Sequence, residues 1–116
     1  MQRINKSFPG VRALIDVDFE ISTGEVVALI GENGAGKSTL MNILGGVHQP
    51  DSGTIEVEGN TTTIKSVSNA DQLGIGFVHQ ELNILDNLDV GANVFLGREP
   101  RRLGIVNSKQ IIEKTK

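Results

Sequence analysis

The chain has 116 residues, 38% of them apolar, which is enough for one modest domain with a hydrophobic core. It contains no cysteine, and this excludes disulfide frameworks, zinc–thiolate sites and thiol nucleophiles. Residues 1–97 carry 5 basic and 12 acidic side chains, whereas residues 98–116 carry 6 basic and 2 acidic ones. The charges of this basic tail are dispersed, and the tail has no aromatic residue that could stack on a base. We therefore expect a solvated segment and no nucleic-acid partner.

The first half of the chain predicts strands that lead into a glycine-rich loop and a helix. Residues 16–22 alternate polar and apolar side chains, as a half-buried strand does, and a turn follows at residues 23–25. Residues 26–30 are continuously apolar, which predicts a strand covered on both faces. After the glycine-rich stretch, one helix face is formed by Leu40, Ile43, Leu44 and Val47, and the helix ends at Gly45 and Gly46.

The second half predicts shorter elements. Turn chemistry at residues 50–53 precedes a strand containing Ile55 and Val57, with residues 61–64 as its hairpin partner. We further expect a helix at residues 66–73 and a buried strand at residues 75–78. A helical pattern that includes Val90 and Val94 follows Gln80. The last predicted helix is capped by Ser108 and has Ile111 and Ile112 on its apolar face. The predicted fold class is an α/β layer whose sheet is mixed.

The chain shows no targeting or membrane-spanning pattern. The first ten residues, MQRINKSFPG, lack the apolar core of a signal peptide, and the longest apolar run, residues 26–30, is too short to cross a bilayer. We therefore expect a cytoplasmic protein with no direct membrane insertion, whose membrane role, if it has one, depends on a partner.

Residues 31–39 fit the phosphate-binding pattern G-x-x-x-x-G-K-[ST]. Glycines permit backbone angles that let successive N–H groups surround a phosphate, and the following helix directs its positive end toward it. The lysine supplies a cation for the outer phosphates and the serine a hydroxyl for Mg²⁺. The predicted ATP-binding residues of this loop are Gly31, Glu32, Asn33, Gly34, Ala35, Gly36, Lys37, Ser38 and Thr39.

Four stretches make the chain resemble the ATP-binding subunit of ABC transporters, and more narrowly the class that imports ribose, xylose, arabinose or galactose. They are KSFPGVRAL (6–14), GENGAGKSTLMNILGGVHQPDSG (31–53), GIGFVHQELN (74–83) and NVFLGREP (93–100). The resemblance implies a P-loop NTPase fold in partial form, ATP and Mg²⁺ as cofactors, and two partners: transmembrane permease subunits and a second ATPase cassette. It also implies a peripheral location on the inner face of the cell membrane.

The resemblance also assigns roles to two residues outside the loop. Phe8 matches the aromatic residue that stacks on the adenine ring, and a π-face suits any flat base. Gln80 matches the glutamine that contacts Mg²⁺ and the attacking water, so it is the candidate catalytic residue and, with Ser38, a candidate metal ligand. His48 and His79 receive no catalytic role, because isolated histidines are more often incidental.

The chain departs from the family pattern in its later motifs. It has no LSGGQ-type signature loop, and the closest candidate for the Walker B strand is residues 84–86, with two apolar residues before Asp86 and Asn87 after it. We therefore expect the first half of the first cassette: residues 1–85 as the front of the ATPase core and residues 86–116 as the start of a helical subdomain. Such a chain is expected to bind ATP without hydrolysing it.

Three alternatives stay open from the sequence. A GTPase would need an N-K-x-D guanine reader, which residues 5–8 fail to match at the last position, and a kinase is a further P-loop enzyme class. A non-catalytic nucleotide-binding or regulatory module would keep the loop and lack hydrolysis. The last alternative is another ABC-class ATPase with no connection to sugar.

Overall fold

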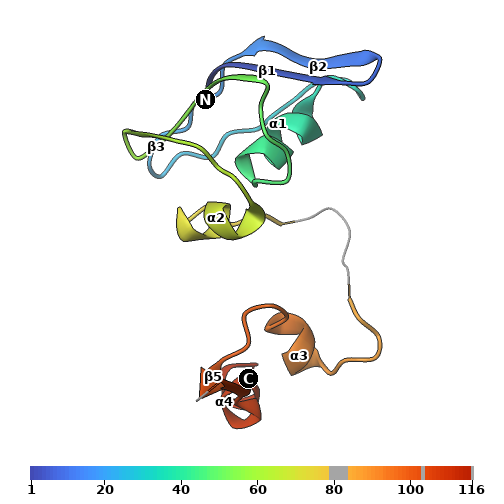
Figure 1. The fold of residues 1–116 in the computed structure, drawn as a ribbon, viewed down its shortest axis with the longest axis vertical. Helices are drawn as coiled ribbons and strands as arrows, with labels where there is room; N and C mark the ends of the chain where they lie inside the picture. Colours follow the sequence, from blue (N-terminus) through green and yellow to red (C-terminus); the bar gives the residue numbers. More distant parts are fainter. Residues whose placement is uncertain (79–83, 103, 116) are drawn as a thin grey trace. The chain divides into compact units, whose positions relative to one another are not determined.

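The computed structural model describes residues 1–78, 84–102 and 104–115. The chain divides into two compact units, Met1–Val78 and His79–Lys116, and each is described by itself (Figure 1). The phosphate-binding pattern and Phe8 both lie in the first unit.

The first unit is built on a four-stranded sheet with strand order β2-β1-β3-β4. All three pairings are antiparallel, and the strands are β1 (Gln2–Phe8), β2 (Val11–Val17), β3 (Ser52–Val57) and β4 (Asn60–Thr62). The β1–β2 hairpin turns at Gly10, whose φ of 79° suits a residue without a Cβ. The predicted hairpin of β3 with its following strand is confirmed, while β1 was not predicted as a separate strand.

Two helices accompany this sheet. Helix α1 (Lys37–Leu44) follows the glycine-rich loop and ends at Gly45, as predicted. Helix α2 (Val67–Gln72) begins after Ser66, whose hydroxyl accepts a hydrogen bond from the Asn69 backbone N–H at 3.2 Å. The sheet and helices share one apolar core, formed by Ile4, Leu14, Leu40, Ile43, Ile55, Ile64 and Ala70.

The expected buried strand at residues 26–30 is not found. This segment forms no strand, and the side chains of Val26 and Ile30 are 97% and 90% exposed. A central strand needs hydrogen-bonding neighbours on both edges, and the described residues of the chain supply none for this segment. For the same reason the expected mixed sheet is absent from the described residues, where every strand pairing is antiparallel.

Two other strand predictions need correction. Residues 75–78 form no strand, and Val78 is 93% exposed, because no neighbouring strand pairs with them in the described part of the chain. The strand predicted at residues 16–22 instead occupies Val11–Val17, where pairing with β1 decides its position. Beyond Val17 the regular strand ends, although Phe19 and Met1 still exchange two backbone hydrogen bonds, of 3.0 and 2.8 Å.

The second unit contains helix α3 (Val90–Val94), the two-stranded pair β5 (Arg101–Arg102) and β6 (Ile105–Val106), and helix α4 (Ser108–Thr115). Asp89 caps α3 by accepting from the Ala92 N–H at 2.7 Å. The predicted last helix exists, but its cap is Asn107 rather than Ser108, because the Asn107 side chain accepts from the Gln110 N–H at 3.3 Å.

Candidate functional site

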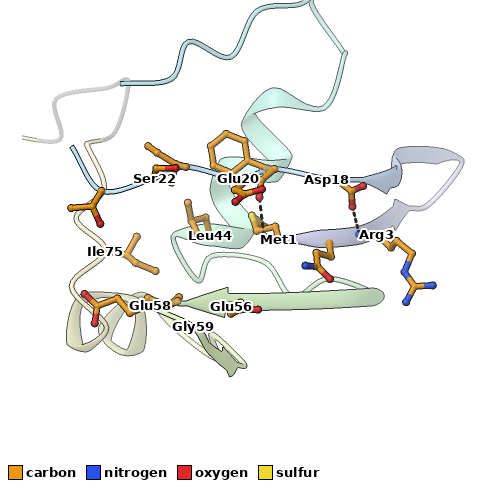
Figure 2. A pocket seen from close by; sticks show the side chains of 15 residues that line it. Met1, Arg3, Asp18, Glu20, Ser22, Leu44, Glu56, Glu58, Gly59 and Ile75 are labelled. Atoms are coloured by element: carbon orange, nitrogen blue, oxygen red, sulfur yellow. Dashed lines mark hydrogen bonds between the residues drawn. The ribbon is translucent and has the colours of Figure 1, made fainter. Parts of the chain in front are cut away.

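A cavity in the first unit has the wrong charge to hold a phosphate. Its volume is about 1190 Å³, and it lies between residues 18–23 and the β3–β4 hairpin (Figure 2). The lining residues include four carboxylates, Asp18, Glu20, Glu56 and Glu58, against two cations, the Arg3 guanidinium and the Met1 terminal ammonium. This excess of carboxylates would repel a polyphosphate, so the glycine-rich loop is the better candidate for a phosphate site.

The backbone of the loop adopts the conformation that its glycines permit. Gly34 and Gly36 have φ angles of 87° and 83°, in the left-handed region that residues with a Cβ rarely enter. Gly36 also packs closely on strand β2, since a Cβ there would lie 2.5 Å from the Ala13 carbonyl oxygen and 2.7 Å from the Leu14 side chain. The loop is therefore shaped both by local backbone angles and by its contact with the sheet.

Backbone N–H groups of the loop are available for a ligand. Within residues 32–36, all of which the structure describes, only the Ala35 N–H donates to the backbone, to the Glu32 carbonyl at 3.2 Å. Gly36 is the N-cap of α1 and provides no side-chain cap, so the N–H groups of the first helical turn have no side-chain partner there. Free N–H groups together with the positive end of a helix form an anion site.

Lys37 spans the mouth of the loop. Its ammonium donates to the carbonyl oxygens of Gly31 and Glu32, each at 2.7 Å. An ammonium has three N–H donors, so one remains for a phosphate oxygen. Ser38, the next residue, is exposed at the start of α1, and Thr39 is half-buried behind it. The residues present thus fit a phosphate ligand, and the Ser38 hydroxyl fits a metal ion held jointly with phosphate oxygens.

Phe8, the predicted base-stacking residue, is half-buried at the end of β1. Its ring lies near-perpendicular to that of His48, with centroids 5.2 Å apart and planes at 69°. The Lys6 ammonium lies over the Phe8 ring, 5.6 Å from its centroid. These are the distances of an edge-type aromatic pair and of a cation–π contact, so the Phe8 ring has neighbours that restrain it.

Comparison with known proteins now identifies the family. The ABC transporter family model matches residues 14–116, which include the whole glycine-rich loop. The chain belongs to the ABC transporter family.

Curated ABC relatives carry names from sugar transport. The chain is 52% identical over 108 residues to a galactofuranose transporter ATP-binding protein from Escherichia coli, covering 93% of this chain and 22% of that protein. It is 48% identical over 111 residues to a ribose import ATP-binding protein from Streptomyces avermitilis, covering 96% and 21%. A ribose import ATP-binding protein from Burkholderia cenocepacia is 54% identical over 101 residues, covering 87% and 20%. The chain thus spans about one fifth of the length of these relatives.

One residue of the predicted ABC site lies outside the part that the structure describes. Gln80, the candidate catalytic residue and metal ligand, belongs to residues 79–83, and so does His79. Among the described residues no group of three or more His, Cys, Asp or Glu side chains could hold a metal ion. No helix in the described ranges is long and apolar enough to span a membrane.

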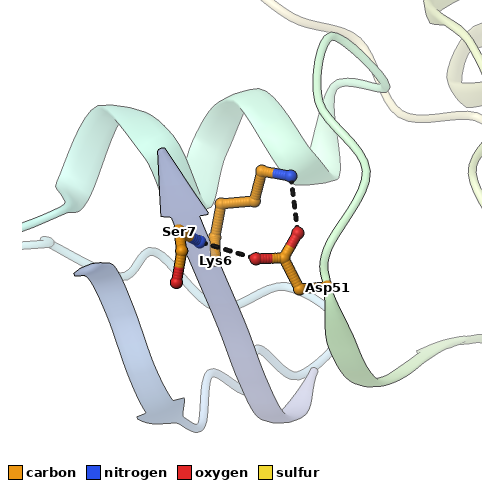
Figure 3. Close-up of polar contacts among 3 residues, drawn as sticks. All are labelled: Lys6, Ser7 and Asp51. Carbon is orange, nitrogen blue, oxygen red and sulfur yellow. Dashed lines mark hydrogen bonds and ion pairs between the residues drawn. The ribbon is translucent and has the colours of Figure 1, made fainter. Parts of the chain in front are cut away.

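An ion pair beside Phe8 was not predicted from the sequence. The Lys6 ammonium donates to one Asp51 carboxylate oxygen at 2.8 Å, and the Ser7 backbone N–H donates to the other at 2.7 Å (Figure 3). Lys6 and Phe8 are two apart on a strand and so share a face, which is a signal the sequence contains. Asp51 and His48 lie forty or more residues away from them in sequence, and nothing in the sequence pattern brings these groups together.

Acid should weaken this ion pair. Donation from Lys6, and then from the Ser7 N–H, lowers the pKa of Asp51 below its ordinary value of 3.8. A carboxyl whose folded pKa is depressed contributes stability above its unfolded pKa, and the contribution is lost as the pH falls below 3.8 toward the folded pKa. Asp51→Asn should therefore flatten the fall of melting temperature at low pH, measured by circular dichroism between pH 6 and about pH 2. If the melting temperature of Asp51→Asn falls at low pH as steeply as that of the parent chain, the Lys6–Asp51 ion pair does not stabilise the fold.

Proposed function

We propose that the chain binds ATP with Mg²⁺ through the loop at residues 31–39. One observation carries the proposal: Lys37 bridges a loop whose Gly34 and Gly36 are left-handed, at the start of a helix. This combination places a cation and unused N–H groups together, as recognition of a polyphosphate requires. Membership in the ABC family supports the same conclusion from an independent side.

Different residues would contact different parts of the bound ATP. Backbone N–H groups of the loop and the first turn of α1 would hold the phosphates, with Lys37 adding a positive charge. Ser38, together with Gln80, would hold Mg²⁺, which when bound neutralises charge on the phosphates. Phe8 would supply a stacking face for the base. The loop glycines keep side chains away from the place where phosphate oxygens must approach the backbone.

The biological setting of the proposal comes from the relatives. Proteins named for galactofuranose transport and ribose import match this chain at about half identity. We infer that the chain is part of the ATPase subunit that energises import of a monosaccharide, working with transmembrane permease subunits and a second ATPase cassette at the cytoplasmic face of the membrane. In this proposal residues 1–85 form the front of the ATPase core and residues 86–116 begin the helical subdomain.

A second candidate function is a nucleotide-binding module without hydrolysis. It applies to residues 1–116 taken by themselves, among which neither an LSGGQ string nor an apolar run ending in Asp-Glu occurs. Both functions share ATP binding at the loop. They differ in whether phosphate is released, and a measurement of turnover separates them.

The proposed base contact can be tested at Phe8. Phe8→Ala should weaken ATP binding by about 1–3 kcal/mol, the range of other base–aromatic contacts, because the stacking face is removed. Phe8→Tyr should bind ATP as the parent chain does, since the ring is retained. Isothermal titration calorimetry with Mg-ATP gives both affinities. Equal affinity of the alanine variant and the parent would mean that Phe8 serves only to fill the structure beside His48.

A further inference from the structure

The Phe8 ring is held by groups from two other parts of the chain. His48 follows helix α1 and meets the ring at 5.2 Å, while Asp51 lies just before β3 and holds Lys6, which covers the ring at 5.6 Å. Neither group comes from the β1–β2 hairpin that bears Phe8. The position of the ring therefore depends on contacts across the first unit and is not set by the hairpin alone.

His48 is itself fixed to the end of α1. The N–H groups of Val47 and His48 both donate to the Asn42 carbonyl, at 2.8 and 3.2 Å. Gly46, with φ 76°, lies against the Ser66 carbonyl so closely that a Cβ could not fit, which pins this segment to the start of α2. The imidazole is thus carried on a backbone that two sets of contacts restrain.

Lys6 is fixed in a comparable way by Asp51. That carboxylate uses one oxygen for the Lys6 ammonium at 2.8 Å and the other for the Ser7 N–H at 2.7 Å (Figure 3). The Lys6 side chain is only 17% exposed. A lysine held at its tip and screened from water loses much of its freedom to leave the ring face.

One helix connects this bracing to the phosphate loop. Helix α1 starts at Lys37, the phosphate-facing cation of the proposed site, and its last turn carries the chain directly into His48. Its eight residues set about 12 Å between the two ends. A nucleotide bound through both its phosphates and its base would bind more tightly when the ring is already ordered than when binding must order it.

We propose that His48, supported by the Lys6–Asp51 pair, is a positioning residue that fixes the Phe8 ring relative to the phosphate loop for the base of a bound nucleotide. The inference rests on the proposed function. The base gains affinity because the ring is already in place and need not be ordered during binding. Loss of the bracing should weaken the binding of a nucleotide and leave the binding of a bare phosphate chain unchanged.

The test compares two ligands on the same protein by isothermal titration calorimetry: Mg-ATP and inorganic tripolyphosphate with Mg²⁺. His48→Ala should raise the Kd for ATP about 2- to 12-fold, the factor that corresponds to an aromatic pair, with the Kd for tripolyphosphate unchanged. His48→Phe keeps an aromatic partner for the ring and should restore ATP affinity. Lys6→Met should act in the same direction as His48→Ala, because the cation over the ring is removed.

Matched controls separate this effect from a general loss of structure. Val47→Ala changes the exposed neighbour of His48. Lys65→Met removes an exposed lysine whose side chain forms no hydrogen bond or ion pair in the described residues. Both variants should leave the two Kd values unchanged. Melting temperatures by circular dichroism identify variants that fail to fold. If His48→Ala is one of them, the ATP affinities of His48→Phe and Lys6→Met still test the positioning role.

Each result has a distinct meaning. If the parent chain binds neither ligand, the proposed function fails. If Phe8→Ala weakens ATP binding while His48→Ala and Lys6→Met do not, the positioning role is wrong and the proposed function survives. A parallel fall in affinity for tripolyphosphate would also overturn the positioning role, because it would place the effect of His48 in the phosphate loop.

Discussion

Lys37→Ala is expected to abolish ATP binding. The ammonium lies across the loop mouth, 2.7 Å from the carbonyl oxygens of Gly31 and Glu32, with one donor left for phosphate. A hydrogen bond to a charged group contributes about 1.5–3 kcal/mol, so losing this one contact raises the Kd by about 13- to 160-fold, and the lost attraction of the charge for the other phosphates adds to this. A methyl group replaces none of this charge. Titration calorimetry with Mg-ATP measures the change, and unaltered affinity would remove the phosphate-loop assignment.

Lys37→Ala is also expected to affect the loop in the absence of a ligand. Since the ammonium bridges two loop carbonyls, its removal loosens the loop as well as removing a phosphate contact. Lys37→Met keeps the aliphatic stem without the charge, and Lys65→Ala removes a cation from an exposed position elsewhere in the first unit. Loss of binding in both Lys37 variants, with normal binding in the Lys65 variant and unchanged circular dichroism, assigns the effect to the charge.

Local chemistry in the sequence was sufficient to predict the helices near the loop. Gly45 and Gly46 end α1, and Ser66 caps α2 with the hydrogen bond that its hydroxyl can make three residues ahead. Such signals depend on neighbours within one turn, and a single sequence contains them completely. The phosphate-binding pattern is of the same kind, because the spacing of its glycines and lysine is itself the structural requirement.

Strand burial could not be predicted in the same way. Residues 26–30 have the composition of a central strand, yet Val26 and Ile30 are almost fully exposed in this structure. The apolar pattern indicates that a segment would be stable when buried as a strand, whereas actual burial depends on which other segments pair with it. The described residues contain no partner for residues 26–30, so the pattern alone led to a wrong prediction.

The neighbourhood of Phe8 shows a third limit of sequence analysis. A resemblance to the ABC family marked Phe8, but His48 had been assigned no role and Asp51 had been assigned only to a turn. His48 reaches Phe8, and Asp51 reaches Lys6 and Ser7, through long-range packing: β1 pairs with β3, which places residues 48–52 beside the end of β1. Contacts between residues 40 or more positions apart follow from the fold, and the fold had to be known first.

The 116-residue chain is expected to bind ATP and to release phosphate very slowly. The groups proposed to hold the phosphates, the loop N–H groups and Lys37, are all present, and they act on binding. Hydrolysis also needs a carboxylate pair and a signature loop, and neither motif occurs in this sequence. Such groups act mainly on the transition state, where each costs about 10²–10³ in kcat when removed.

The measurement is steady-state phosphate release by the 116-residue chain beside a longer relative, such as the Escherichia coli galactofuranose transporter ATP-binding protein. Release by the chain should be at least about 100-fold slower, with a Kd for ATP that changes far less, because the missing groups stabilise the transition state more than the bound nucleotide. Circular dichroism must first show that the chain is folded, since residues 26–30 expose apolar surface and an unpaired backbone. If the folded chain releases phosphate as fast as the relative, and loses this activity on Lys37→Ala, then residues 1–116 contain a complete hydrolytic site and the carboxylate pair and signature loop are not required.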